Sequence, residues 1–204
     1  MTELHGLAAA DLLATRPLNT RWGVWQEHAF RYAKTDIIAL AYGGWEAESE
    51  VTVRIHSTCF AAHYLESLEC DCREQLVMAY ETITDRGAGV IVFLEQDGRD
   101  NGQVALMRAA LHARSTGSTQ SDAYAALGYA VDARDYKGGG VVLAQLGVQR
   151  ACLLSNNPRK VEALESVGIV VRPESHLVEP TNDAGRRFYR DKALEGYLIP
   201  PELL

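Results

Sequence analysis

Three cysteines lie close together in the segment Cys59-Phe-Ala-Ala-His-Tyr-Leu-Glu-Ser-Leu-Glu-Cys70-Asp-Cys72. A Cys-x-Cys pair lets two thiolates converge on one metal ion, and the third thiolate comes from the far end of a short loop. Three protein ligands leave zinc a fourth position for water, which is typical of a catalytic site. A zinc ion lowers the pKa of such a water towards neutrality. The spacing therefore favours a hydrolytic zinc site.

Two other interpretations of these thiols stay open. His56 or His63 could complete a closed structural site with four ligands. The thiols could also be buried without any metal, although their number and spacing favour a metal. A fourth cysteine, Cys152, lies inside an apolar segment and is expected to pack in the core.

A second group of residues is basic and is interrupted by glycine. Arg54 and His56 directly precede the cysteine segment. Gln96-Asp97-Gly98-Arg99 follows an apolar run, where a ligand-contacting loop is expected. Ser155-Asn-Asn-Pro-Arg-Lys160 combines a strand end, a hydroxyl group, a helix N-terminus and two cations, which suits a phosphate group. A solvated helix face is an equally good interpretation of those two cations.

A third group, Asp132-Ala-Arg134-Asp135-Tyr136, is densely charged and follows Leu127-Gly-Tyr129 in an expected loop. Alternating charges of this kind usually form ion pairs on the solvated surface. Taken in isolation, the segment is therefore interpreted as a surface salt-bridge lattice.

Composition limits the classes of function that remain. A chain of 204 residues with 47% hydrophobic and 23% charged residues is typical of a soluble globular domain. Its net charge of -7 disfavours nucleic acid or anionic membrane as a partner, and no apolar run approaches the roughly 20 residues that span a bilayer. The start of the chain has no basic end and apolar block of a signal peptide. A cytoplasmic location with reduced cysteines is expected.

The patterning predicts a mixed α and β single domain, of the α+β class. Residues 1–20 are expected to be loosely structured. Short apolar runs predict strands at 37–42, 51–55, 90–94 and 151–154. Helices are predicted at 73–86, 103–113, 141–146 and 186–196, and a further helix is predicted to begin at Pro158 with Asn157 as its cap.

Four segments, in this order along the chain, resemble the GTP cyclohydrolase II family. They are Arg54-Ile-His-Ser-Thr-Cys59, Ser67-Leu-Glu-Cys70-Asp-Cys72, Leu127-Gly-Tyr-Ala-Val-Asp132-Ala-Arg134-Asp135-Tyr136 and Leu153-Leu-Ser-Asn-Asn-Pro-Arg-Lys160. The resemblance implies a catalytic domain at 18–173, preceded by a lead-in at 1–17. A polar C-terminal tail with a terminal helix then covers 174–204.

The resemblance also implies roles for individual residues. Cys59, Cys70 and Cys72 match the ligands of one zinc ion per chain. Arg134 matches an arginine proposed to attack the α-phosphate and displace pyrophosphate, although electrostatic stabilisation would serve equally well. Asp132 matches the proton acceptor. The positions that match nucleotide-binding residues are Arg54, Ile55, His56, Ser57, Thr58, Gln75, Asp97, Gly98, Arg99, Thr119, Ser155 and Lys160.

The activity that the resemblance implies is that of a hydrolase acting on cyclic amidine C–N bonds. Water attacks C8 of the guanine ring of GTP, and a second hydrolysis releases formate on the route to riboflavin. Magnesium is expected with the triphosphate, and a homodimer is expected as the assembly.

Departures from the family pattern surround the base and the metal. Where the family reads Arg-Gln-Glu-Gly-Arg, this chain has Glu95-Gln-Asp-Gly-Arg, so the glutamate expected to read the guanine is the shorter Asp97. Ala110 stands at the position where the family has a tyrosine implicated in hydrolysis. Tyr124 or Tyr136 could replace the missing phenol. These changes leave open an enzyme that stops at a formamidopyrimidine, one that opens another base such as that of a uracil nucleotide, or a non-catalytic nucleotide-binding zinc protein.

Overall fold

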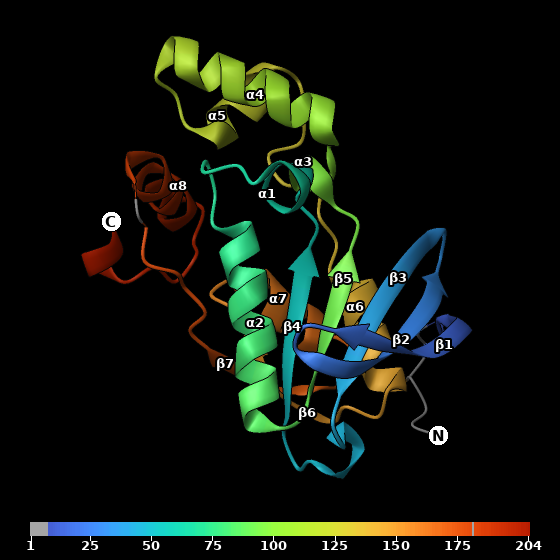
Figure 1. Cartoon of the computed structure of the whole chain (residues 1–204). Coiled ribbons are helices and arrows are strands. Elements are labelled where there is room, and N and C mark those ends of the chain that lie inside the picture. Colours follow the sequence, from blue (N-terminus) through green and yellow to red (C-terminus); the bar gives the residue numbers. More distant parts are fainter. Residues whose placement is uncertain (1–7, 181) are drawn as a thin grey trace. The chain divides into compact units, whose positions relative to one another are not determined.

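Seven strands form one mixed sheet in the computed structural model, which describes residues 8–180 and 182–204. The strands lie in the order β1-β2-β3-β5-β4-β6-β7 (Figure 1). Antiparallel pairing joins β1 to β2, β2 to β3 and β3 to β5, whereas β6 pairs in parallel with β4 and β7. The bounds are β1 Asp11–Thr20, β2 Gly23–Tyr32, β3 Thr35–Tyr42, β4 Val51–Ser57, β5 Gly89–Leu94, β6 Arg150–Leu154 and β7 Val170–Glu174.

Two compact units divide the elements of the chain. The first, called the sheet unit below, covers residues up to 56, 74–94 and 136–177 and contains the sheet with α6, α7 and most of α2. The second, called the helical unit, covers 57–73, 95–135 and 178–204. The helices are α1 Phe60–Leu65, α2 Cys72–Arg86, α3 Asp97–Asp100, α4 Gln103–Thr116, α5 Gln120–Ala126, α6 Lys137–Gln145, α7 Pro158–Glu165 and α8 Asp183–Leu194, with 3-10 turns at Trp45–Ala47 and Pro201–Leu203.

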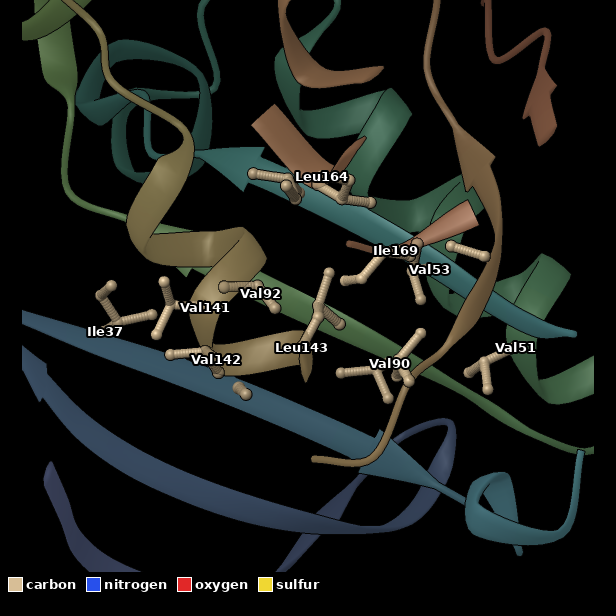
Figure 2. Close-up of a cluster of buried hydrophobic side chains, with 14 of the residues drawn as sticks. Ile37, Val51, Val53, Val90, Val92, Val141, Val142, Leu143, Leu164 and Ile169 are labelled. Carbon is tan, nitrogen blue, oxygen red and sulfur yellow. The ribbon is translucent and has the colours of Figure 1, made fainter. Parts of the chain in front are cut away.

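Helices cover both faces of the sheet, and side chains of β5 alternate between them. Val92 points to the face covered by α6 and α7, where it packs in one core with Leu143 (Figure 2). Ile91 points to the opposite face and packs in a second core with Ile83 of α2. Because neither face meets water, β5 is a continuous apolar run rather than an alternating one.

The predicted α+β class is confirmed, and most predicted elements occur within a few residues of their expected bounds. Helices α2, α4 and α8 correspond to the predictions at 73–86, 103–113 and 186–196. Asn157 caps α7 as expected, because its side-chain oxygen accepts a hydrogen bond from the Arg159 amide at 3.0 Å. In residues 8–180 and 182–204, no helix has the length and apolarity needed to cross a membrane.

The expectation of loose structure over residues 1–20 is wrong for Asp11–Thr20, which forms β1. Nearly all side chains of this edge strand are exposed, so it carries no apolar alternation that the sequence could reveal. Backbone pairing with β2 defines it instead, and an edge position tolerates Pro17. Residues 1–7 of the expected lead-in lie outside the described residues, and the predicted domain boundaries stay predictions.

Helix α5, Gln120–Ala126, was not predicted from the sequence. The Thr119 hydroxyl caps this helix by accepting a hydrogen bond from the Asp122 amide at 3.1 Å. The cap satisfies an amide that the first turn of a helix otherwise leaves without a partner. Strands β2 and β7 were also not anticipated.

Replacing Leu143 by alanine should lower the free energy of unfolding by about 2 to 5 kcal/mol, because this fully buried side chain leaves a cavity in the α6 core. Urea denaturation measures the loss. Leu111→Ala is the matched control, since Leu111 is 65% exposed on α4 and its truncation should cost less than about 0.5 kcal/mol. Equal losses in the two variants would contradict this assignment of the core.

Candidate active site

Three thiols converge in the helical unit, where the chain leaves β4 and before it enters α2. Cys59 is the N-cap residue of the short helix α1, and Cys72 is the first residue of α2. Helix α1 ends at Glu66 in the left-handed conformation, and the Ser67 amide donates to the Ala61 carbonyl at 3.0 Å. This closing turn directs the chain back, so that all three sulfur atoms lie within 4.8 Å of one another.

The geometry of the thiols fits a tetrahedral metal ion. Zinc–sulfur bonds of about 2.3 Å at tetrahedral angles place neighbouring sulfur atoms about 3.8 Å apart, and the Cys59 and Cys70 sulfur atoms are 4.0 Å apart. All three cysteines are free thiols. Hydrogen bonds from Cys70 and Cys72 lower the pKa of Cys59 to about 3, while donating to Cys59 raises the pKa of Cys70. The cluster thus holds negative charge on sulfur, which suits a soft divalent cation.

No histidine joins this cluster in the part of the chain that the structure describes, so the group consists of the three thiols. His63 Nδ1 instead accepts a hydrogen bond from the Cys59 amide at 3.1 Å. Three ligands are the number that leaves a coordination position open for water or substrate. Cys152 is buried in β6, as its apolar surroundings predicted.

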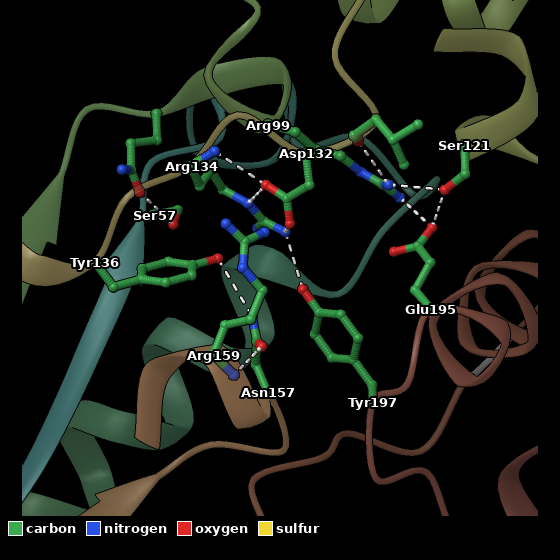
Figure 3. A network of polar contacts seen from close by, with 12 residues as sticks. Ser57, Arg99, Ser121, Asp132, Arg134, Tyr136, Asn157, Arg159, Glu195 and Tyr197 are labelled. Carbon is green, nitrogen blue, oxygen red and sulfur yellow. Dashed lines mark hydrogen bonds and ion pairs between the residues drawn. The ribbon is translucent and has the colours of Figure 1, made fainter. Parts of the chain in front are cut away.

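Asp132 and Arg134 form a bidentate ion pair in the helical unit (Figure 3). Arg134 Nε and Nη2 each lie 2.8 Å from an oxygen atom of the Asp132 carboxylate. Their side chains are only 15% and 16% exposed, so the interpretation as a solvated surface lattice is wrong for this pair. Arg134 Nη2 also donates to the Tyr197 hydroxyl at 2.9 Å. These contacts fix the guanidinium plane.

Arg99 extends from a left-handed turn. Gly98, Arg99 and Asp100 have φ angles of 59°, 59° and 66°, a conformation that is unfavourable for residues other than glycine. Asn101 stabilises the turn by donating from its side-chain amide to the Gly98 carbonyl at 3.2 Å and to the Ala130 carbonyl at 2.9 Å. Backbone strain of this kind is often retained where it directs a functional side chain.

Asp97 and Gln96 connect this turn to the thiol segment. The Asp97 carboxylate accepts a hydrogen bond from the Phe60 amide at 3.2 Å, next to the thiol of Cys59. Gln96 accepts from the Ser57 hydroxyl at 3.2 Å and donates to the Asp135 carbonyl at 2.6 Å. Within the helical unit, hydrogen bonds of Asp97 and Gln96 therefore link the thiol segment to Asp135, the residue that follows Arg134.

The sheet unit contains a separate group of buried cations. Arg54 Nη1 donates to the Leu154 carbonyl at 2.7 Å, and its Nη2 donates to Gln75 Oε1 at 2.5 Å. Lys160 Nζ donates to the Ile55 carbonyl at 2.8 Å. The interpretation of a solvated helix face is thus wrong for Lys160, which is buried, although Arg159 of the same turn is exposed.

Other residues predicted for the site are divided between the two units. In the sheet unit, His56 is buried in β4, and the Ser155 hydroxyl accepts a hydrogen bond from the Asn157 amide at 3.1 Å. Asn157 also donates from its side chain to the Tyr136 hydroxyl at 3.2 Å (Figure 3). In the helical unit, Thr58 directly precedes Cys59 and is half-buried.

Of the two candidate replacement phenols, Tyr124 lies in the same unit as the thiols. Its side chain is fully buried, and its hydroxyl makes no hydrogen bond within residues 8–180 and 182–204. The hydroxyl lies 3.6 Å from the position that a Cβ would take at Gly98. Burial raises the pKa of Tyr124 to about 12, so the group is a neutral phenol at physiological pH.

Three residues near these groups were not predicted from the sequence: Asn101, Glu195 and Tyr197. Asn101 lies two residues after Arg99, next to the segment in which departures from the family pattern were noted, and that position is the signal that could have identified it. Glu195 and Tyr197 lie in the terminal segment that was predicted only as a helix and polar tail. Glu195 lies 2.8 Å from Arg99 Nη2, a contact across 96 residues of sequence.

The fold and these groups define a class: an α+β protein that has, in one unit, a cluster of three thiols able to hold a metal ion and a half-buried Asp–Arg ion pair. The sequence model of the family described as GTP cyclohydrolase II matches residues 12–175. The chain belongs to this family.

Similar proteins include a riboflavin biosynthesis protein of Vibrio vulnificus, 37% identical over 178 residues, which cover 86% of this chain and 48% of that protein. The RibBA riboflavin biosynthesis protein of Aquifex aeolicus is 40% identical over 164 residues, 79% of this chain and 40% of that protein. The chain thus spans less than half the length of these two relatives. It is 35% identical over 187 residues to the GTP cyclohydrolase-2 of Shewanella denitrificans, with 91% of each chain covered.

Among solved structures, the chain is similar to RibBX, a two-domain 3,4-dihydroxy-2-butanone 4-phosphate synthase from A. baumannii. The TM-score is 0.49 at 21% sequence identity, and the match covers 84% of this chain and 42% of that chain. A likeness of this size supports no conclusion about this chain.

Replacing Cys70 by serine should reduce bound zinc from one ion per chain to a trace, because a serine hydroxyl stays protonated and is a poor zinc ligand. Metal analysis of the purified protein measures the zinc content. Cys152→Ser is the matched control, since this thiol lies outside the cluster, and it should retain zinc. Full zinc content in the Cys70 variant would overturn the ligand assignment.

Proposed function

We propose that this protein is a zinc-dependent nucleotide cyclohydrolase that opens the base ring of GTP and releases pyrophosphate. The observation that carries the proposal is the occurrence of the thiol cluster and the Asp132–Arg134 pair in one unit. The first suits metal-assisted hydrolysis, and the second suits chemistry at a phosphate. Membership of the GTP cyclohydrolase II family supports GTP as the nucleotide.

Cys59, Cys70 and Cys72 are the residues that would hold one zinc ion. When bound, zinc supplies Lewis acidity and lowers the pKa of water, so that hydrolysis can proceed near neutral pH. The ligand set consists of thiols alone, which distinguishes it from the oxygen-rich sites that magnesium prefers. Magnesium is proposed to enter with the triphosphate instead.

Arg134 is proposed to act at the α-phosphate while Asp132 holds its guanidinium. A bidentate carboxylate keeps the guanidinium charged and aligned, which favours electrostatic stabilisation of the phosphoryl transition state. The same Asp132 oxygen atoms, 2.8 Å from Nε and Nη2, stand where a proton acceptor is needed if the arginine acts as a nucleophile. Both roles depend on the same pair of side chains.

Asp97 is proposed to bind the base. A carboxylate accepts two charge-assisted hydrogen bonds from neighbouring N–H groups, such as N1–H and the exocyclic amine of guanine. Its contact with the Phe60 amide, next to Cys59, supports a role close to the metal ligands. A uracil ring presents a single N–H between two carbonyl groups and offers the shortened carboxylate fewer donors, so GTP is favoured over a uracil nucleotide.

Phosphate binding in the sheet unit is proposed for Arg54, Ser155 and Lys160. The support is that both cations are buried and are fixed by carbonyl oxygens, so little side-chain entropy is lost when an anion binds. The proposal includes Ile55, His56 and Gln75 in the sheet unit, and Ser57, Thr58, Gly98, Arg99 and Thr119 in the helical unit, as further nucleotide-binding positions.

A second candidate function is favoured by one observation: Ala110 stands where the family has a tyrosine. Without that phenol, the reaction would stop after ring opening and leave a formamidopyrimidine. A homodimer in the cytoplasm, without nucleic acid or membrane as a partner, completes the proposal. The non-catalytic alternative is disfavoured, because a binding protein needs neither the thiol cluster nor the Asp132–Arg134 pair.

Incubation of the zinc-loaded protein with single nucleotides tests the function. Pyrophosphate should be released from GTP and not from UTP, and Arg134→Lys should lower its rate by about a hundredfold or more, since lysine cannot make the bidentate contact. Arg108→Lys, at an exposed arginine of α4, is the control and should leave the rate unchanged. The proposal fails if no nucleotide yields pyrophosphate.

Replacing Ala110 by tyrosine should raise the amount of formate released per pyrophosphate from GTP, because it restores a phenol at the family's position. Formate and pyrophosphate are assayed in the same reaction. Leu111→Tyr adds the same side chain at an exposed position of α4 and should leave the ratio unchanged. A wild-type ratio of formate to pyrophosphate near one, unchanged by Ala110→Tyr, would refute the second candidate function. In that case, loss of formate release in Tyr124→Phe would identify Tyr124 as the proton donor.

A further inference from the structure

The C-terminal segment beyond the family match, which ends at residue 175, contacts several parts of the candidate site in the helical unit. Helix α8 and the residues that follow it contact the thiol segment, the start of α5, and two arginines of the candidate site, Arg99 and Arg134. The contact pairs are Tyr189 with Asp71, Asp191 with Gln120, Glu195 with Arg99, and Tyr197 with Arg134.

Tyr189 anchors α8 to the thiol segment. Its hydroxyl lies 2.7 Å from the carboxylate of Asp71, the residue between Cys70 and Cys72. Tyr189 is 1% exposed, and Lys192 approaches the same carboxylate at 3.5 Å. A buried hydroxyl and an ion pair at this point hold the helix in one place against the loop.

Glu195 forms an ion pair with Arg99 largely out of solvent, with side chains 16% and 11% exposed (Figure 3). Its carboxylate oxygen also accepts a hydrogen bond from the Ser121 hydroxyl, which in turn accepts one from Arg99 at 3.0 Å. The three groups close a hydrogen-bonded ring. Glu195 therefore fixes the direction of an arginine that leaves a strained left-handed turn.

Tyr197 contacts Arg134 in a different way. Its hydroxyl accepts a hydrogen bond from Nη2, the nitrogen that also contacts Asp132. A phenol is a neutral acceptor, so it orients the guanidinium without neutralising the charge that a phosphate would meet. A second carboxylate at this place would orient the group as well but would repel the phosphate.

We propose that Glu195 and Tyr197 are positioning residues of the nucleotide site, supplied by the C-terminal segment. Glu195 orients the guanidinium group of Arg99 for nucleotide binding. Tyr197 orients the guanidinium group of Arg134 for the release of pyrophosphate at the α-phosphate. The proposal rests on the proposed function for its kinetic consequences. The orientation of the two arginines is independent of the substrate.

Kinetics with GTP separate the two roles. Tyr197→Phe should lower kcat for pyrophosphate release by about tenfold with little change in KM, and Glu195→Gln should raise KM by about tenfold with less change in kcat, as expected for loss of a hydrogen bond to a charged group. The matched controls are Tyr129→Phe, which removes a hydroxyl bonded to Arg108, and Glu50→Gln, which removes a half-buried carboxylate paired with Arg172. Both controls should match the wild type.

Arginine labelling tests the positioning without any substrate. Phenylglyoxal modifies accessible guanidinium groups, and peptide mass spectrometry reports the rate at each arginine. Tyr197→Phe should accelerate labelling of Arg134, and Glu195→Gln should accelerate labelling of Arg99, each by several-fold over the wild type. Arg31, which pairs with Asp36 in the sheet unit, serves as the internal reference and should label at one rate in every variant.

The two experiments distinguish the proposals from each other. Faster labelling together with the split between kcat and KM supports the positioning roles. Unchanged labelling of Arg99 and Arg134 in the variants overturns them, whatever the activity. If the wild type turns over no nucleotide, the proposed function fails, while labelling still decides whether the segment positions the arginines. If Tyr197→Phe and Glu195→Gln both keep the wild-type kcat and KM, the C-terminal segment has only a structural role, and the inference is overturned.

Discussion

Buried positive charge is the constraint on which the candidate site depends. A guanidinium or ammonium group removed from water is strongly destabilising unless protein oxygen atoms replace its hydration. Carbonyl oxygens do so for Arg54 and Lys160 in the sheet unit. Carboxylates do so for Arg134 and Arg99 in the helical unit. Each cation is therefore directed by acceptors that the fold itself holds in place, which is the arrangement that binding and catalysis of an anionic substrate require.

The thiol cluster presents the opposite electrostatic problem. Two thiolates at 4.0 Å repel one another, and the hydrogen bond between Cys59 and Cys70 accordingly lowers the pKa of Cys59 and raises that of Cys70. A dication removes this repulsion, so metal binding and the closure of the loop between α1 and α2 favour each other. Cys59 follows the end of β4, and Cys72 is the first residue of α2; within the sheet unit, β4 and α2 each pack in an apolar core.

Departures from the family pattern lie in one unit. Glu95, Asp97 and Ala110 all belong to the helical unit, whereas Arg54 and Lys160 of the sheet unit match the family. The helical unit also contains the C-terminal segment that lies beyond the family match. Under the proposed function, the cations assigned to the phosphates therefore match the family, whereas the carboxylate assigned to the base and the position of the phenol differ from it.

Local patterns in the sequence were sufficient for several features: the thiol cluster, the buried strands as continuous apolar runs, and the cap of α7 at Asn157. Each depends on residues that are near in sequence or on a simple periodicity. Tertiary structure alone decided that β1 is a strand, because its side chains are exposed and only pairing with β2 defines it. It also decided that Lys160 is buried, and that Tyr197 reaches Arg134 across 63 residues. No local pattern encodes such contacts, since they arise only when the completed fold brings distant segments together.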